Sequence, residues 1–337
     1  MNTRVSQAAI VCGTVSRRAT LWCLAASAIS LAGVQARAQD DKSPVILLVG
    51  AASSMDFTAR LIAEHLREAL GRPVVVVSKL GAGGRLALGD LKRAAADGRT
   101  LMFSTSSVFA IYPNIYTKLD YDPVADFTPV AGVCWFDLGI ATGPMTGAPD
   151  MRQLITWSKA QKDGLVYGCA PGAGSSSHFV GIALAQATAV TMTPAHYPNS
   201  GNAIIDLSAG RLPMVVTGTS PLAEQHKAGK IRLLAVSGEQ RSPLLPDVPT
   251  LKEAGVNVTL QNSAGLFGPA RMPRELVDRI HNAVAQMLTR ADVRDKLAGQ
   301  GMAVSPMNGT QLAASLAEDR KRFEGLVNAS GYVRENL

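Results

Sequence analysis

Three short segments of the sequence combine residue types that could bind an anion: Gly50–Asp56, Ser104–Ser107 and Ala170–Ser177. Each follows an apolar run, is rich in small or hydroxyl-bearing residues, and contains no lysine, arginine or histidine. Backbone N–H groups where a helix begins attract negative charge, at about 0.3–1 kcal/mol for each helix end. A carboxylate held by dipoles, hydroxyls and water is therefore the expected chemistry. The residues that we single out in these segments are Ala52, Ser53, Ser54, Asp56, Ser104, Thr105, Gly172, Ala173, Gly174 and Ser175.

Catalytic and metal-binding patterns are weak in this sequence. The five histidines show no metal-ligand spacing. Ser175–Ser177 next to His178 could be a nucleophile and its base, but neighbours at a helix start rarely face each other, and such serines usually cap the helix. Gly81 and Gly83 follow a strand, but Leu86 stands where a dinucleotide site needs a third glycine. We expect no enzyme, no cofactor and no metal, and keep a secreted serine hydrolase as a minor alternative.

The first 38 residues read as a signal peptide. Arg4, Arg17 and Arg18 form a basic start, an apolar stretch follows over residues 21–34, and Ala36-Arg-Ala38 offers a cleavage site. The paired arginines leave the general secretory and twin-arginine routes both open. Removing this segment takes away four arginines and no acid, which lowers the formal charge from +7 to +3. We therefore expect a periplasmic protein that does not bind nucleic acid.

The elements that must position the three segments alternate between strand and helix. Apolar runs predict buried strands at 45–49, 73–77, 101–104, 130–140, 165–169, 212–217 and 231–236. Amphipathic periodicity predicts helices between them and two more at 274–288 and 310–327. This order predicts mostly parallel, doubly wound sheets in two α/β domains. Cys134 and Cys169 remain after cleavage, and they could form one disulfide or stay as two buried thiols.

At the level of whole phrases, the chain resembles the tripartite tricarboxylate transporter receptor family, the TctC or Bug proteins, from about Pro44 to Gly331. The phrases that carry the resemblance are Leu80-Gly-Ala-Gly-Gly84, Ala96-Asp-Gly98, Tyr121-Asp-Pro-Val124, Asp126-Phe-Thr-Pro-Val130, Ala228-Gly-Lys-Ile-Arg-Leu-Leu-Ala-Val236, Leu245-Pro-Asp-Val-Pro-Thr250 and Gly265-Leu-Phe267.

The resemblance implies a type II periplasmic binding protein, a Venus flytrap of two doubly wound α/β domains with a ligand cleft between them. It places Gly50–Asp56 and Pro171–Ser177 around a small organic carboxylate, and it adds Tyr197, whose alternative role is to stabilise its own turn. We expect residues 39–132 and 240–337 to form domain 1, and residues 133–239 to form domain 2.

This chain departs from the family pattern near the ligand. The first loop is shorter than usual, Pro198-Asn199 replaces a lysine, and Ser263-Ala264 replaces aromatic residues. A more hydroxylated wall of this kind could admit a bulkier or more polar acid. Because one carboxylate held by dipoles alone would bind weakly, we expect a second polar contact with Ser104–Ser107 or with Thr217–Thr219. The expected partners are membrane transporter subunits or, alternatively, a sensor protein, and the expected state is a monomer.

Overall fold

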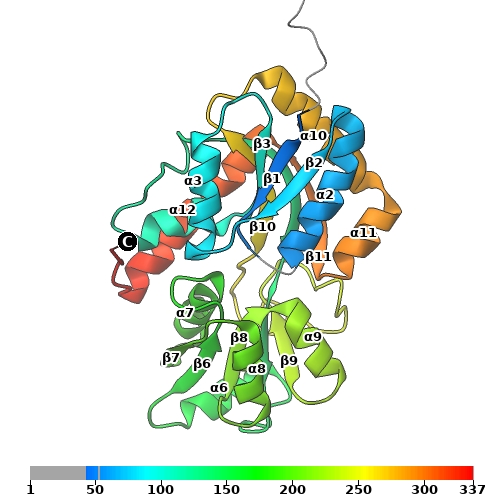
Figure 1. The fold of residues 1–337 in the computed structure, drawn as a ribbon. Helices are drawn as coiled ribbons and strands as arrows, with labels where there is room; N and C mark the ends of the chain where they lie inside the picture. Colours follow the sequence, from blue (N-terminus) through cyan, green and yellow to red (C-terminus); the bar gives the residue numbers. More distant parts are fainter. Residues whose placement is uncertain (1–42, 52–53, 337) are drawn as a thin grey trace, which may run out of the picture. The chain divides into compact units, whose positions relative to one another are not determined.

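The computed structural model describes residues 43–51 and 54–336, and these form two mixed β-sheets with helices on both faces of each (Figure 1). In the first sheet, β1 (Val45–Val49) pairs in parallel with β2 (Val74–Ser78) and β3 (Thr100–Thr105). Strand β10 (Asn262–Pro269) runs antiparallel to β3 and β4 (Phe127–Phe136), and β11 (Met302–Asn308) runs antiparallel to β4. The strand order is β11, β4, β10, β3, β1 and β2.

Strand β1 is buried on both faces, as its unbroken apolar run predicts. Leu47 and Val49 pack against one group of helices, whereas Leu48 packs against another. The first group is α2 (Ser54–Leu70), α10 (Arg274–Thr289) and α11 (Ala291–Ala298). On the opposite face lie α3 (Arg85–Arg93), α4 (Ser107–Ala110) and α12 (Gly309–Ser330), while the 3-10 turn Ala82–Gly84 precedes α3 and α5 (Tyr112–Ile115) follows α4.

The second sheet is built in the same way from the middle of the chain. Its order is β7 (Met192–His196), β6 (Leu165–Cys169), β8 (Met214–Gly218), β5 (Leu138–Thr142) and β9 (Arg232–Val236). Strand β6 pairs in parallel with β7 and β8, and β5 runs antiparallel to β8 and β9. One face is covered by α6 (Met151–Lys159) and α7 (Ser176–Thr188), the other by α8 (Ser200–Ser208) and α9 (Thr219–Lys227).

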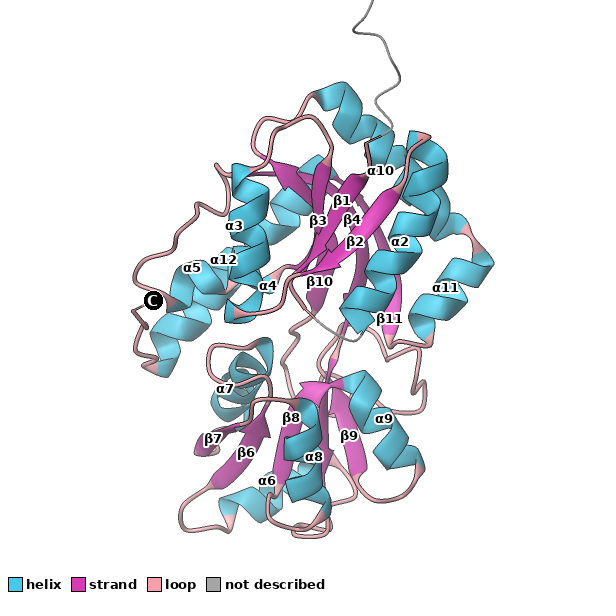
Figure 2. Cartoon of the chain, viewed as in Figure 1, coloured by secondary structure: helices cyan, strands magenta, loops and turns pink. Residues whose placement is uncertain are grey.

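Two stretches of chain cross between the sheets (Figure 2). The first passes from β4 to β5 through the single residue Asp137, and the second runs from β9 through residues 237–261 to β10. The C-terminal helix α12 adds a packing contact, because the rings of Phe179 on α7 and Phe323 on α12 lie 5.7 Å apart. The sheets are therefore joined by backbone at one side and by side-chain packing at another.

The α/β fold class is confirmed, and three details of the sequence prediction are wrong. The sheets are mixed rather than mostly parallel, because β5, β10 and β11 run antiparallel to their neighbours. Strand β2 is an edge strand with Val75 and Val77 exposed, not a buried one. The predicted strand 130–140 is broken at Asp137 into β4 and β5. Cys134 and Cys169 are two buried free thiols and do not form a disulfide.

Candidate functional site

The loop before α7 contains four of the predicted ligand residues in one tight turn. Gly172 and Gly174 have φ values of +78° and +68°, a conformation that side chains with a Cβ rarely adopt. Ser175 caps α7: its hydroxyl accepts from the His178 N–H at 3.3 Å and donates to the Gly172 carbonyl at 2.7 Å. Ala173, the fourth predicted residue, is exposed. The turn thus presents Ala173 and the start of α7 outward, while its hydroxyls stabilise the turn itself.

A hydrogen-bonded bridge joins this loop to the first sheet. The Ser176 hydroxyl donates to Oδ1 of Asn262 at 2.6 Å and lies 3.3 Å from the Ser107 hydroxyl. We call these three residues the serine–asparagine bridge. Gly174 lies against the same region, since a Cβ added there would stand 2.5 Å from Cδ1 of Ile115. The predicted segments 104–107 and 170–177, which are far apart in sequence, therefore meet in space.

Asn262 is a residue that sequence reasoning did not single out. It is buried at the start of β10, beside Ser263, and three residues before the Gly265-Leu-Phe267 phrase. A polar pair opening an otherwise apolar strand was the available signal. Ser104 and Thr105 lie close by at the end of β3, where they pair with Gly265 and Ala264 of β10.

The first predicted segment reaches the same edge of the first sheet, because Val49 of β1 is in register with Phe103 of β3. Ala52 and Ser53 lie outside the described residues. Ser54 is the first residue of α2, and Asp56 belongs to its first turn rather than to the preceding loop. The Asp56 carboxylate accepts from Nε of Arg60 at 2.7 Å and from the Ser78 hydroxyl. The hydrogen bond from Arg60, and to a smaller extent that from Ser78, lowers the pKa of Asp56. The Asp56 carboxyl is therefore ionised and paired.

Thr217 and Tyr197 both have their hydroxyls engaged. The Thr217 hydroxyl lies 2.7 Å from that of Ser200, at the start of α8, and 3.5 Å from the carbonyl of Ala170. It therefore ties the α8 turn to the loop before α7. The Tyr197 hydroxyl donates to Oδ2 of Asp206 at 2.6 Å, and burial together with this bond raises the pKa of Tyr197 to about 12. That geometry matches a role in stabilising the turn.

The serine–histidine alternative lacks a nucleophile–base pair. Nδ1 of His178 accepts a hydrogen bond from the Gly174 N–H at 3.2 Å, and the hydroxyls of Ser175 and Ser177 donate to backbone carbonyls. Burial lowers the pKa of His178 to about 4, so the ring is neutral. The sulfur–imidazole pair of Cys169 with His196, at 3.1 Å, is also inert, because burial raises the pKa of the thiol to about 12.

Within the described residues there is no grouping of histidine, cysteine and acidic side chains that could hold a metal ion. The helices of the described part also include none that is long and apolar enough to cross a membrane.

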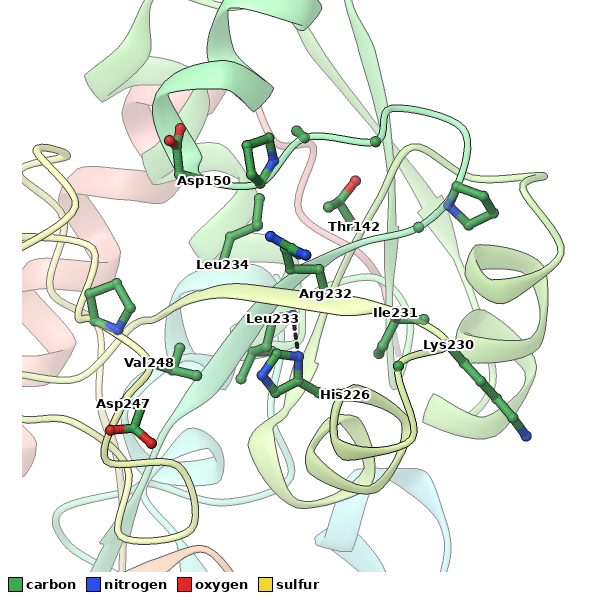
Figure 3. A pocket seen from close by; sticks show the side chains of 17 residues that line it. Thr142, Asp150, His226, Lys230, Ile231, Arg232, Leu233, Leu234, Asp247 and Val248 are labelled. Carbon is green, nitrogen blue, oxygen red and sulfur yellow. Dashed lines mark hydrogen bonds between the residues drawn. The ribbon is translucent and has the colours of Figure 1, made fainter.

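One hollow of the described part lies elsewhere, at the end of the second sheet where β5 stops and β9 begins. It measures about 740 Å³ and includes the side chains of Thr142, Asp150 and Arg232 (Figure 3). A second hollow of about 500 Å³ lies between α7, α12 and residues 257–260. Neither is lined by any predicted ligand residue that the structure describes, so both hollows lie apart from those residues.

Comparison with known proteins identifies relatives that match nearly the whole chain. The family model described as "Tripartite tricarboxylate transporter family receptor" matches residues 58–332. A UPF0065 protein of Bordetella bronchiseptica is 30% identical over 94% of this chain and 95% of that protein. Protein BugT of Bordetella pertussis is 28% identical over 90% of this chain and 95% of its own length.

Solved structures match over most of the chain as well. Rpa4515 of R. palustris with adipate has a TM-score of 0.77 at 26% identity, covering 88% of this chain and 100% of that one. MatC of Rhodopseudomonas palustris with bound malate has a TM-score of 0.71 at 28% identity, covering 84% and 99%. The periplasmic binding protein BugD has a TM-score of 0.73 at 26% identity, covering 87% and 99%.

Proposed function

Because this chain belongs to the tripartite tricarboxylate transporter receptor family, we propose that it captures a small organic carboxylate and delivers it to the membrane subunits of such a transporter. The protein acts in the periplasm, where residues 1–38 direct it before they are removed. It makes and breaks no covalent bond. Because relatives were solved with adipate and with malate, aliphatic dicarboxylic acids, with or without a hydroxyl group, are the first ligand class to test.

The ligand lies where the helices α2 and α7 begin, between the loops of the two sheets. The single observation that carries this proposal is the serine–asparagine bridge, which brings the β3–α4 loop against the start of α7. Free backbone N–H groups at these helix starts attract a carboxylate, and the hydroxyls of Ser104 and Thr105 offer a second contact. Arg60, on α2, is already paired with Asp56, so its charge is not free for the ligand.

The proposed ligand contacts are those singled out from sequence, but four of them act through the turns that they hold, because their side chains are already hydrogen-bonded: Asp56, Ser175, Thr217 and Tyr197. Tyr197 contributes through the position of its turn rather than through its hydroxyl, which already donates to Asp206. Residues 39–132 and 240–337 would form one closing lobe and residues 133–239 the other, with two changes. Residues 133–136 belong to β4 and so to the first sheet, and residues 245–260 pack on the second. The two crossings, at Asp137 and at the exit of β9, act as the hinge.

A thermal-shift screen of the purified mature protein with mono-, di- and tricarboxylates, adipate and malate included, tests the function. An acid at 100 times its dissociation constant stabilises the folded state by about 2.7 kcal/mol. Calorimetry then compares Ser104→Ala with Ser208→Ala. Ser104 is buried and its hydroxyl makes only a 3.5 Å contact, whereas the Ser208 hydroxyl bonds within its own helix. Weaker binding in the first variant alone supports the proposal; a panel in which no carboxylate raises the melting temperature overturns it.

Delivery is tested separately, by reconstituting the ligand-loaded protein with the membrane subunits in vesicles and following uptake of the labelled acid. Uptake supports the transport role. Binding without uptake, joined to a response of a sensor protein, would replace transport with signalling.

A further inference from the structure

One acidic side chain is buried at the crossing between the sheets and has no hydrogen-bond partner in the part of the chain that the structure describes. Asp137, the single residue between β4 and β5, is 1% exposed, and both of its carboxylate oxygens lack a hydrogen-bond partner among the described residues. A buried polar group in a folded protein normally has a partner, and an ionised carboxylate in such a place is costly.

The backbone around Asp137 is held by hydrogen bonds, so the missing partners concern its carboxylate alone. The carbonyl of Asp137 accepts from the N–H and the hydroxyl of Thr219, at 3.3 and 3.1 Å. The next residue, Leu138, exchanges hydrogen bonds with Ser237: its N–H donates to the Ser237 hydroxyl at 3.1 Å and its carbonyl accepts at 2.8 Å. The Ser237 hydroxyl in turn donates to Leu260 at 2.6 Å. Ser237 therefore fastens both crossings together beside Asp137.

Glycine at position 238 makes room for the carboxyl. A Cβ on Gly238 would lie 2.0 Å from Oδ1 of Asp137, so the acid packs directly on the bare backbone at the exit of β9. The first sheet reaches this place too. A Cβ on Gly301, in the turn before β11, would lie 3.6 Å from Cβ of Ser220, the residue after Thr219. The turn before β11 thus lies against the start of α9, whose first residue bonds to the carbonyl of Asp137.

Charged neighbours do not compensate the buried acid. On the segment after β9, Glu239 is exposed and Arg241 is paired with Glu253 at 2.9 Å. On α9, Glu224 and Lys227 are exposed, and His226 accepts a hydrogen bond from Leu233. Burial alone raises the pKa of Asp137, to about 7, with no charged group contributing.

We propose that Asp137 is a proton-sensitive hinge residue: the arrangement of the sheets described here forms when its carboxyl is neutral, and ionisation separates the segments that cover it. Ligand capture by closure of the two lobes, which rests on the proposed function, then takes up a proton. The apparent affinity for a carboxylate ligand therefore rises as the pH falls from 8 to 6.

Spin labels test the hinge without any ligand. Lys227→Cys on α9 and Arg294→Cys on α11 are exposed sites on opposite sheets, and the native thiols are buried. With a hydrated Asp137 titrating near 3.9 and the buried one near 7, the ratio of the described to the separated arrangement falls about tenfold from pH 6 to pH 8. Distance distributions from electron resonance report this ratio.

The same labels in Asp137→Asn should show no pH dependence. Asp319→Asn is the matched control, because Asp319 is also buried with a raised pKa but lies 3.7 Å from Arg322; its pH dependence should equal that of the wild type. In the wild-type background, a ratio of described to separated arrangement that stays constant from pH 6 to pH 8 overturns the proposal. This test does not depend on whether a variant at position 137 folds. A pH dependence retained in Asp137→Asn also overturns the proposal.

Titration with adipate and malate separates the two proposals. If neither binds while the labelled protein responds to pH, the ligand class fails and the hinge stands. If they bind with an affinity that is independent of pH, and the labels do not respond, the function stands and the hinge fails.

Discussion

The Ser176 hydroxyl donates a 2.6 Å hydrogen bond to Oδ1 of Asn262, and so joins the first residue of α7 to the first residue of β10. Asn262 belongs to the first sheet and Ser176 to a helix that packs on the second, and they lie 86 positions apart in the sequence. Because the Ser107 hydroxyl is 3.3 Å from the same hydroxyl, the start of α4 also takes part in the contact. The place where these segments meet is thus held by neutral hydroxyl and amide groups.

Ser176→Ala should lower the free energy of unfolding by about 1 kcal/mol, because the buried Asn262 oxygen loses its donor. Ser208→Ala is the control, since that hydroxyl bonds only to Ile204 in its own helix. Its effect should stay within about 0.5 kcal/mol. Urea unfolding of both variants measures the difference, and equal stabilities would show that the bridge contributes nothing.

The fold could be predicted from sequence where local patterns decide the structure. Val45–Val49 and Leu165–Cys169 form strands with the predicted bounds, because short apolar runs bounded by turn residues have few alternatives. Strands β10 and β11 were not predicted as strands, since they depend on pairing with β4, which is remote in sequence. The valines of β2 read as buried because an apolar run does not reveal whether its strand ends at the edge of a sheet.

The candidate site divides in the same way. Its loops follow from the order of strand and helix, so segments 104–107 and 170–177 were predicted and do meet. Asn262 and the tie between Tyr197 and Asp206 depend on side-chain geometry that no periodicity encodes. The partner-less burial of Asp137 was likewise invisible, because the sequence shows only an acid within a strand-like run.

The stability of the protein should fall as the pH rises from 4 to 7, through Asp137. Burial raises the pKa of Asp137 to about 7, above the value near 3.9 in an unfolded chain. Between these two values the folded state binds the proton of Asp137 and the unfolded chain does not. The resulting stabilisation of the folded state is complete below about pH 4. It falls by up to about 1.4 kcal/mol per pH unit and is lost by about pH 7. Urea unfolding of the wild type and Asp137→Asn at each pH gives the difference curve. A difference that does not change with pH would contradict the assignment.

His178 should contribute with the opposite sign. Burial lowers its pKa to about 4, so the unfolded chain, titrating near 6.5, binds more protons between these values. The contribution of the neutral ring is present above pH 6.5 and is lost as the pH falls towards 4. His178→Asn keeps an acceptor for the Gly174 N–H and removes the titration. The wild-type minus variant stability should rise with pH in this range; a falling curve would mean that the folded protein holds a charged imidazole.

Gly238→Ala should destabilise the protein by about 1–3 kcal/mol, since the added methyl would lie 2.0 Å from Oδ1 and 2.8 Å from Cγ of Asp137. The clash needs the carboxyl, so the same change in an Asp137→Ala background should cost less, with a coupling of about 1 kcal/mol or more. Gly325→Ala on α12 is the control: a Cβ there meets nothing within 4 Å, and alanine in a helix should stabilise by about 0.5–1 kcal/mol. Urea unfolding of the four members of the cycle at pH 8 measures the coupling. Strictly additive costs would mean that Gly238 is required by the backbone alone, and that Asp137 does not press on the exit of β9.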